Sequence, residues 1–331
     1  MNGRQIFPGL LGNERIRSIL ADDLAAGKSA HAYILEGPRG SGKHTAARLI
    51  AASSLCENRA DPAEPLPCGH CTACRKILGG HSVDVMTVSR GDRATLGVDS
   101  IREVKESLWV TPNDGERKFY LIEDAHLMTA QAQNALLLSL EEPPPYVMFL
   151  LLCEDAALLL ETIRSRAPVL KMERFSESAV EDWLTKNTDG ANRKRISYAA
   201  RLSDGALGYA KELYEHGDGE ITRYQTAGEL ARLLVSGKKS EAAVFLPSLP
   251  KNRQELCEVL TLTRLALRDM IADKKGGDLL FYSASEGVPT YAKRISARRV
   301  VELIRALSKA EDDISANVSA NVVMTALLFK A

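Results

Sequence analysis

The stretch GPRGSGKHTAAR, residues 37–48, decides the fold of the first half of the chain. It differs at one position from the phosphate-binding P-loop pattern G-x-x-x-x-G-K-[S/T], in which backbone N–H groups and a lysine surround the phosphates of a nucleotide. Gly37, Gly42 and Lys43 occupy their pattern positions, but His44 stands where the pattern has the hydroxyl that holds Mg²⁺. The motif therefore predicts a P-loop fold and leaves open whether the loop serves a nucleotide.

The residues on either side of this loop have the pattern that the motif requires. HAYILEG, residues 31–37, is a short apolar run that ends in glycine and predicts a buried strand. Residues 44–56 predict a helix, and the apolar runs at 118–122 and 146–153 predict two more strands. Strand, glycine loop and helix in this order are the context in which a P-loop functions. We therefore expect an α/β domain with a parallel sheet.

Two carboxylates follow the predicted strand at residues 118–122. In P-loop ATPases, carboxylates at a strand end anchor Mg²⁺ and polarise the attacking water. Glu123 and Asp124 are of the right type but in the reverse of the usual Asp-Glu order, and a displacement of about 1 Å can cost roughly 10²-fold in rate. Thr45 has a hydroxyl but lies one helical position beyond the pattern, so it points elsewhere. The candidate nucleotide-site residues are Gly37, Gly40, Gly42, Lys43, His44, Thr45, Glu123 and Asp124.

Four cysteines after the first helix have a spacing typical of a metal site. Cys68, Cys71 and Cys74 form a C-x-x-C-x-x-C run, and Cys56 precedes it by eleven intervening residues. Four thiolates complete a closed tetrahedral Zn²⁺ site, which indicates a structural role because no coordination position stays open. Prolines and glycines around them indicate a loop insertion. Four unconnected reduced thiols, or a nearby histidine in place of one cysteine, are the alternatives.

Length and charge limit what the rest of the chain can be. Its 331 residues exceed one ordinary core and predict two or three domains. Forty-three basic and forty-three acidic residues balance, so no overall field draws the protein to DNA or to a membrane. The apolar run VMFLLLC is far shorter than the about 20 residues that span a bilayer, and the first residues lack a signal-peptide core. We expect a cytoplasmic protein with reduced thiols and no membrane partner.

The second half of the chain predicts helices. Strand patterns fade after about residue 168, and residues 176–187 begin with a serine and acidic residues, a typical helix start. Residues 193–213 predict two helices on either side of Gly205. Two later segments have the periodicity of helices with one apolar face. In residues 256–271 the face comprises residues 256, 259, 260, 263, 267, 270 and 271, and in residues 298–314 it comprises Val300, Leu303, Ile304 and Leu307. Such stripes indicate a helical core rather than a binding site.

Together these segments resemble the AAA+ subunits of the bacterial DNA polymerase III clamp loader, most closely those of the delta-prime type. FPGLLGNERIRSIL (7–20) and HAYILEGPRGSGK (31–43) are similar to the family's first segment and its P-loop strand. KFYLIEDAHLMTAQAQNALLLSLEEPP (118–144) resembles its Walker B strand and the following helix. TIRSRA (162–167) resembles its Ser-Arg-Cys motif, with Ala167 in place of cysteine. The four cysteines match its zinc insertion, and the resemblance runs nearly end to end.

The resemblance implies a three-part fold. An α/β P-loop domain with a parallel sheet spans residues 1–167 and carries the zinc insertion at 56–74. A small helical lid follows at 168–230, and an all-α collar that joins subunits into a ring follows at 231–331. The implied role is that of delta-prime, which helps to load the sliding clamp onto primed DNA. This makes the chain a subunit of the DNA polymerase III holoenzyme, a DNA-directed DNA polymerase and nucleotidyltransferase.

Departures from the family's ATPase members lie in the chain's own nucleotide site. His44 replaces a threonine, and Glu123–Asp124 reverses the Walker B order. The sensor-1 position falls on Cys153–Glu154, and the sensor-2 arginine position falls on Gly208. The resemblance therefore implies no ATP hydrolysis by this chain. ATP or ADP is compatible with the loop, whereas Mg²⁺ is disfavoured there.

What the chain keeps is the Ser165–Arg166 pair, which in the family acts as an arginine finger on the ATP of a neighbouring subunit. Taken alone, this arginine can equally be a solvated cation at a helix end. The implied partners are the gamma/tau-type ATPase subunits, the delta subunit and the sliding clamp, with primed DNA reached through the complex. The implied cofactor is structural Zn²⁺.

Two alternatives stay open. The first is an ATP-hydrolysing gamma/tau-type motor subunit with unusual motifs, although we expect a tau-type chain to extend beyond the collar, whereas this one stops at Ala331. The second is an unrelated P-loop kinase or helicase, which the cysteine insertion and the helical second half fit poorly.

Overall fold

The computed structural model describes residues 4–25, 30–189, 192–282 and 287–330. The chain divides into two compact units. The first unit comprises Met1–Ala191 with Leu202–Lys211, and the second comprises Asn192–Arg201 with Glu212–Ala331. Among the described residues, no helix combines the length and the apolar character needed to cross a bilayer.

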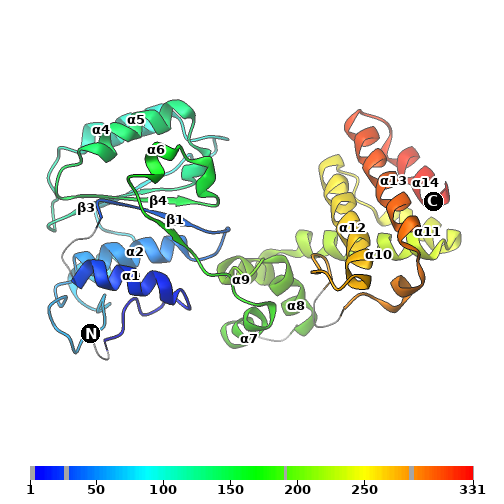
Figure 1. Ribbon diagram of the computed structural model, residues 1–331, viewed down its shortest axis with the longest axis horizontal. Coiled ribbons are helices and arrows are strands. Elements are labelled where there is room, and N and C mark those ends of the chain that lie inside the picture. The colour runs from blue at the N-terminus through cyan, green and yellow to red at the C-terminus, as the bar shows by residue number, and fades with distance from the viewer. Residues whose placement is uncertain (1–3, 26–29, 190–191, 283–286, 331) are drawn as a thin grey trace. The chain divides into compact units, whose positions relative to one another are not determined.

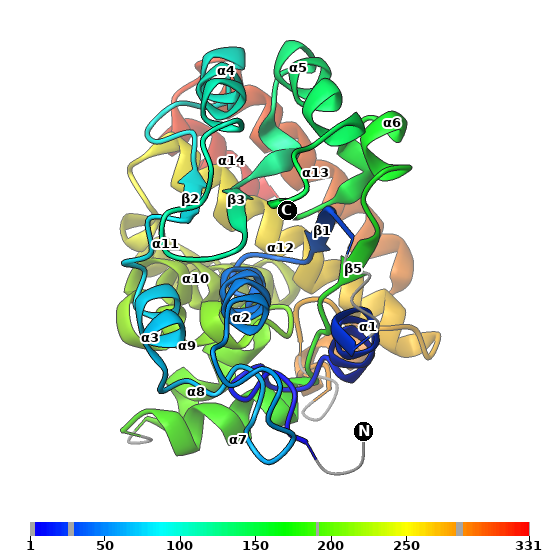
Figure 2. The same cartoon turned by 90° about the vertical axis from the view of Figure 1, so that its left-hand side faces the viewer.

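A five-stranded sheet in the order β2-β3-β4-β1-β5 forms the centre of the first unit, and every pairing in it is parallel (Figure 2). The strands are β1 (Ala32–Glu36), β2 (Val85–Val88), β3 (Lys118–Ile122), β4 (Val147–Cys153) and β5 (Val169–Lys171). β3 and β4 are buried along their whole length, and β1 is buried up to its last residue. Strands covered on both faces read as continuous apolar runs, which is why the sequence predicts these three.

Helices cover both faces of this sheet (Figure 1). On one face lie α1 (Glu14–Ala25) and α2 (Lys43–Ser54), and on the other lie α4 (Val98–Ser107), α5 (Ala130–Glu141) and α6 (Glu161–Arg164). A short helix, α3 (Thr72–Leu78), follows α2. The predicted fold class, an α/β domain with a parallel sheet followed by helices, is thus confirmed.

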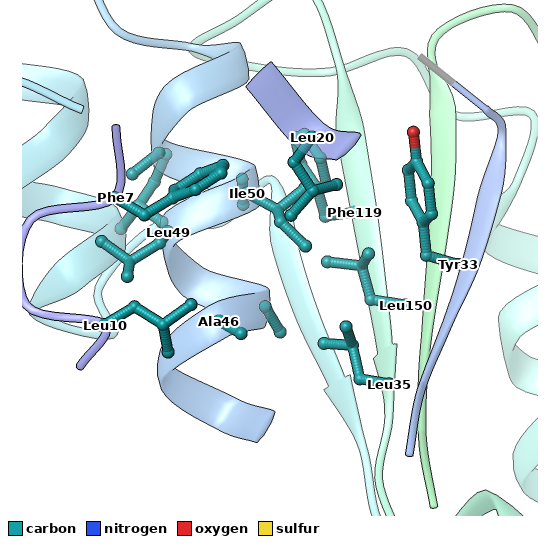
Figure 3. Packing of buried hydrophobic residues seen from close by; sticks show 14 of the residues in the cluster. Phe7, Leu10, Leu20, Tyr33, Leu35, Ala46, Leu49, Ile50, Phe119 and Leu150 are labelled. Atoms are coloured by element: carbon teal, nitrogen blue, oxygen red, sulfur yellow. The ribbon is translucent and has the colours of Figure 1, made fainter. Parts of the chain in front are cut away.

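Alternating strand residues supply the two halves of the core. Leu35 of β1 and Leu150 of β4 face α2, and Figure 3 shows Ala46 and Ile50 of α2 directed at them. Ile34, the neighbour of Leu35, belongs to the cluster under α4 and α5. Because successive strand residues point to opposite faces, one five-residue strand serves both layers.

Helices α7 (Glu177–Asn187), α8 (Arg193–Leu202) and α9 (Leu207–His216) follow the sheet. Ser176 caps α7 by accepting a hydrogen bond from the N–H of Ala179, as the sequence predicts for a serine at a helix start. Gly205, in the turn between α8 and α9, has a φ of +77°, a conformation that glycine adopts without steric cost.

All regular secondary structure in the described residues of the second unit is helical. Its principal helices are α10 (Asp218–Ser236), α11 (Lys239–Phe245), α12 (Arg253–Lys274), α13 (Ala297–Ser315) and α14 (Ala320–Lys330). The predicted apolar face of α12 is buried from Leu256 to Met270, and Val300, Leu303 and Leu307 of α13 are buried as well. These stripes form a core, as the sequence indicates.

Asp269 is the exception on α12, because it is charged and fully buried. Its carboxylate accepts hydrogen bonds from the N–H groups of Leu280, Phe281 and Tyr282, and Arg268 pairs with it at 3.0 Å. A buried charge is tolerated where it is paired and hydrogen-bonded in this way. Asp269 therefore fastens the segment after α12 to the bundle.

Candidate functional site

The carboxyl ends of β1, β3 and β4 bring the predicted nucleotide-site residues to one edge of the sheet. Glu36 at the end of β1 lies opposite Cys153 at the end of β4, and the N–H of Gly37 donates to the carbonyl of Cys153 at 3.1 Å. Glu123 and Asp124 follow directly on β3, the next strand along. Open parallel sheets bind their ligands at this edge, so the predicted residues lie where such a ligand would.

The P-loop between β1 and α2 is closed around its own lysine. Gly40 and Gly42 have φ values of +73° and +94°, which glycine adopts readily. Residue Lys43 is only 9% exposed. Its ammonium group donates hydrogen bonds to the carbonyls of Gly37 at 2.5 Å and Pro38 at 2.9 Å. Burial lowers the pKa of Lys43, and the nearby Glu154 opposes this shift. The lysine is thus bound to the loop itself.

His44 and the two carboxylates after β3 form a cluster beside the loop. The His44 Nδ1 lies 3.4 Å from the Glu123 Oε1. Asp124 has a φ of +48°, and its Oδ2 accepts a hydrogen bond from the Arg90 Nε at 3.1 Å. The carboxylates therefore diverge, one toward α2 and the other toward Arg90. Thr45 is exposed on α2.

The predicted sensor-2 position lies against the outside of the P-loop. The N–H of Gly208, in the first turn of α9, donates to the carbonyl of Gly40 at 2.9 Å. A Cβ on Gly208 would lie 2.8 Å from that oxygen, closer than real side chains approach. The Arg39 guanidinium lies 5.3 Å from the centre of the Tyr209 ring, a cation–π contact. A larger side chain at residue 208 is incompatible with this packing.

Buried contacts fix the segment that carries Ser165 and Arg166. The Gln133 side chain on α5 donates to the carbonyls of Met128 and Leu158 and accepts from the N–H of Leu160, the residue before α6. Ile163 is fully buried beneath α6, and Ala167 is 1% exposed. The last turn of α6 is therefore firmly held while its polar residues face outward.

Arg166 is bound within its own subunit. One guanidinium nitrogen donates to the Glu141 Oε1 at 2.7 Å, and another to the Thr162 carbonyl at 2.9 Å and the Ser165 Oγ at 3.4 Å. The Arg166 side chain is 35% exposed and the Glu141 side chain 44% exposed. The cation is reachable from solvent but has an anionic partner.

The four predicted metal ligands meet in one buried cluster. The sulfurs of Cys56, Cys68, Cys71 and Cys74 all lie within 4.8 Å of one another, and those of Cys68 and Cys74 are 3.9 Å apart. Tetrahedral coordination at a Zn–S distance of about 2.3 Å requires sulfurs about 3.8 Å apart. The donor set and spacing fit Zn²⁺. His70 contacts Asn58 and Glu64 instead.

Backbone donors favour ionisation of part of this cluster. The N–H of Cys71 donates to the Cys68 sulfur and the N–H of Cys74 to the Cys71 sulfur, each at 3.4 Å. Burial alone would raise the pKa of Cys68, but backbone donors at Cys71 and His70 lower it to about 6. Burial raises the pKa of Cys56 and Cys74. A bound dication would supply the charge that ionises all four thiols.

The insertion packs into the core of the first unit. Cys56 lies two residues after the end of α2, and Cys71 caps α3. The cysteines belong to the cluster that contains Phe7 and Leu10, and Leu66 exchanges backbone hydrogen bonds with Gln5 and Phe7. A metal here would fasten the N-terminal segment, α2 and α3 together.

Comparison with known proteins places this geometry in a family. A family model described as "DNA polymerase III, delta subunit" matches residues 12–176, which contain the P-loop, the cysteines, Glu123–Asp124 and Arg166. The chain belongs to the DNA polymerase III clamp-loader family. The DNA polymerase III subunit gamma of Buchnera aphidicola subsp. Schizaphis graminum is 33% identical over 216 residues, covering 64% of this chain and 58% of the relative.

Other members of the clamp-loader family match over more of the chain. The DNA polymerase III subunit tau of Bacillus subtilis (strain 168) is 27% identical over 333 residues, covering 94% of this chain and 58% of the relative. A solved gamma subunit-related protein of Thermotoga maritima is 17% identical, covers 96% of this chain and 97% of that chain, and superposes with a TM-score of 0.44. This chain spans 58% of the length of each of the two curated relatives.

Two residues of the clamp-loader site escaped the sequence analysis. Arg90, after the edge strand β2, contacts Asp124, and Glu141, the last residue of α5, contacts Arg166. The EEPP segment, residues 141–144, closes the stretch that resembles the family's helix, but it gave no sign that one of its glutamates binds the predicted finger. The signal available was a carboxylate at a helix C-terminus, an unfavourable position without a cation nearby.

Proposed function

We propose that this chain is the delta-prime-type subunit of a bacterial DNA polymerase III clamp loader. It acts in the cytoplasm within a ring of gamma/tau-type ATPase subunits and a delta subunit, and the complex places the sliding clamp on primed DNA. In this role the chain completes the ATP site of a neighbour and does not hydrolyse ATP itself.

The contact between His44 and Glu123 carries the proposal. In P-loop NTPases, Mg²⁺ lies between the hydroxyl after the P-loop lysine and a strand-end carboxylate. Here an imidazole stands at the hydroxyl position, and its Nδ1 lies 3.4 Å from the carboxylate. The two groups that would share the metal contact one another directly, and neither Lys43 nor Asp124 is free of an internal partner.

The contact between Gly208 and Gly40 supports the same conclusion. An arginine that senses the γ-phosphate must extend from the lid into the site, but residue 208 has no side chain and its backbone touches the loop. Loss of the metal ligand, reversal of the acids and loss of the sensor arginine all lower hydrolysis in the chain's own site.

The proposed trans role of Arg166 is tested by its replacement. An arginine finger contributes roughly 10³–10⁵ in turnover at the site it completes. Arg166→Ala should therefore silence one site of the assembled complex and lower its DNA-stimulated ATPase activity, while ring assembly measured by size-exclusion chromatography is unchanged. Arg164→Ala is the matched control, because Arg164 is an exposed arginine two residues earlier. Equal activity of the two variants would reject the role.

We propose further that Cys56, Cys68, Cys71 and Cys74 hold a structural Zn²⁺. When bound, the ion would cross-link α2, α3 and the N-terminal segment, and a closed four-sulfur site leaves it no catalytic position. Metal analysis of protein purified without added zinc should find one zinc per chain. A substoichiometric trace would contradict the assignment.

The alternative is a gamma/tau-type motor, which the similarity to gamma and tau subunits of other bacteria favours. It predicts appreciable Mg²⁺-dependent ATP hydrolysis by the purified chain alone. The delta-prime proposal predicts none above a preparation of Lys43→Ala protein. A clear excess of the unmodified chain over that control would favour the motor.

A further inference from the structure

Arg166 pairs with Glu141 of its own chain, and this glutamate has a distinct place in the structure. Glu141 is the last residue of α5, and Pro143 to Pro145 follow it closely. Proline restricts the residue before it and cannot continue a helix, so α5 ends here. Glu141 therefore lies at the negative end of the helix dipole, where a carboxylate is unfavourable and a cation favourable. The last turn of α5 contains no basic residue of its own.

Arg166 supplies the missing cation. Its guanidinium donates to the Glu141 carboxylate at 2.7 Å and, through a second nitrogen, to the Thr162 carbonyl. The Gln133 contacts hold α6 against α5, so the distance between the two side chains is set by buried structure. Both side chains of the pair are partly exposed to solvent, Arg166 at 35% and Glu141 at 44%.

We propose that Glu141 is a positioning residue for Arg166, holding the finger within its own subunit until the triphosphate of a neighbouring subunit displaces the carboxylate. This inference rests on the proposed trans role of Arg166. A triphosphate carries more negative charge than one carboxylate and accepts the same kind of charge-assisted hydrogen bond from a guanidinium, so it competes effectively. Glu141 thereby makes engagement of the finger depend on the presence of nucleotide next door.

The expected effect is modest, because exposed ion pairs are weak. Exposed ion pairs typically contribute about 0–1 kcal/mol. A pair of this strength between Arg166 and Glu141 leaves the Arg166 guanidinium unpaired for roughly a sixth to a half of the time. The apparent affinity of the neighbouring site for ATP is reduced by that fraction. Removing the Glu141 charge should therefore lower the KM for ATP about two- to six-fold, with kcat at saturating ATP unchanged.

The experiment uses Glu141→Gln in the assembled complex and measures ATPase activity against ATP concentration. Glu142→Gln is the matched control, since Glu142 is the adjacent exposed glutamate and forms no ion pair within the described residues. The KM should fall with Glu141→Gln and not with the control. The difference should shrink at roughly 0.5 M salt, where exposed charges are screened.

A double-mutant cycle separates this inference from the proposed function. In an Arg166→Ala background, Glu141→Gln should leave KM unchanged, because the interaction is already absent. If Arg166→Ala alone leaves activity intact, the trans role fails. If Arg166→Ala lowers activity but Glu141→Gln raises KM or leaves it unchanged, the trans role stands and the holding role of Glu141 is overturned.

Discussion

Replacement of Gly40 by alanine tests whether the first turn of α9 is packed on the P-loop. A Cβ at Gly40 would lie 2.1 Å from the backbone nitrogen of Tyr209 and 2.7 Å from its Cα. Backbone atoms cannot rotate away as a side chain can, so the first turn of α9 must retreat from the loop. The hydrogen bond from Gly208 to the Gly40 carbonyl would be lost with it.

The cost of this change has three parts. An alanine at a φ of +73° costs about 1–2 kcal/mol. The lost hydrogen bond contributes about 0.5–1.5 kcal/mol, and forced overpacking about 1–3 kcal/mol. We expect Gly40→Ala to lower the free energy of unfolding of the first unit by roughly 3–6 kcal/mol. That is a large fraction of the stability of an ordinary domain, about 5–15 kcal/mol.

Gly91 offers a matched control. It has a φ of +58°, but an added Cβ there would meet nothing within 4 Å. Gly91→Ala should therefore show the backbone cost alone, about 1–2 kcal/mol. The difference between the two variants isolates the clash with Tyr209.

Urea unfolding followed by tryptophan fluorescence measures the difference in stability between the two variants, and it reports on the first unit of the chain. Both tryptophans of the chain, Trp109 and Trp183, belong to the first unit, so the signal excludes unfolding of the second. The midpoint should fall further for Gly40→Ala than for Gly91→Ala at a similar slope. Equal midpoints would refute the packing of α9 on the P-loop.

Three further outcomes follow from buried polar groups. Cys74→Ser should abolish stoichiometric zinc and lower the melting temperature, and metal analysis with calorimetry measures both; an unchanged zinc content would remove Cys74 from the ligand set. Asp269→Ala should leave three backbone N–H groups unpaired and cost about 3–5 kcal/mol in the second unit, followed by far-UV circular dichroism; a loss below 1 kcal/mol would contradict this. Burial, assisted by the charge of Glu36, raises the pKa of Cys153 to about 12, so its thiol stays neutral as the pH rises from 7 to 9. Alkylation of Cys153 followed by mass spectrometry should then accelerate with pH in urea but not in the folded protein, and acceleration in both would show that the thiol is not shielded.

Burial on both faces is what made the central strands predictable. β1, β3 and β4 are apolar along almost their whole length because helices cover both sides of them. β2 escaped prediction because it is a four-residue edge strand whose side chains are half-buried or exposed. α4 escaped because its apolar signal rests on few positions, chiefly Ile101 and Val104.

The candidate site also has a part that the sequence predicts and a part that it does not. The P-loop and the cysteine run are local patterns whose spacing reflects the geometry of a single ligand, and the structure brings each set together. The pairing of Arg90 with Asp124 joins residues 34 positions apart, and that of Arg166 with Glu141 joins residues 25 apart. Among forty-three cations and forty-three anions, residue type alone does not select these partners. The fold selects them by setting which helix ends and strand ends approach.

The P-loop has a structural role in this chain, because its glycines and its lysine make close contacts within the first unit. The Lys43 ammonium links two carbonyls of the loop and offsets the charge of Glu154 at the end of β4. Gly40 allows the close approach of α9, and Gly37 leaves room for Ser41 and Met172, whose atoms would lie within 2.8 Å of an added Cβ. The lysine contacts close the loop on itself, and the glycines allow the loop to pack closely on α9 and on Met172. A change that restored a hydroxyl at residue 44 would supply one missing ligand but would leave Gly208 against the loop and Asp124 bound to Arg90. Under the proposed function, hydrolysis in this site would therefore require several coordinated changes, whereas Arg166 is already 35% exposed and would need only the ATP of a neighbouring subunit.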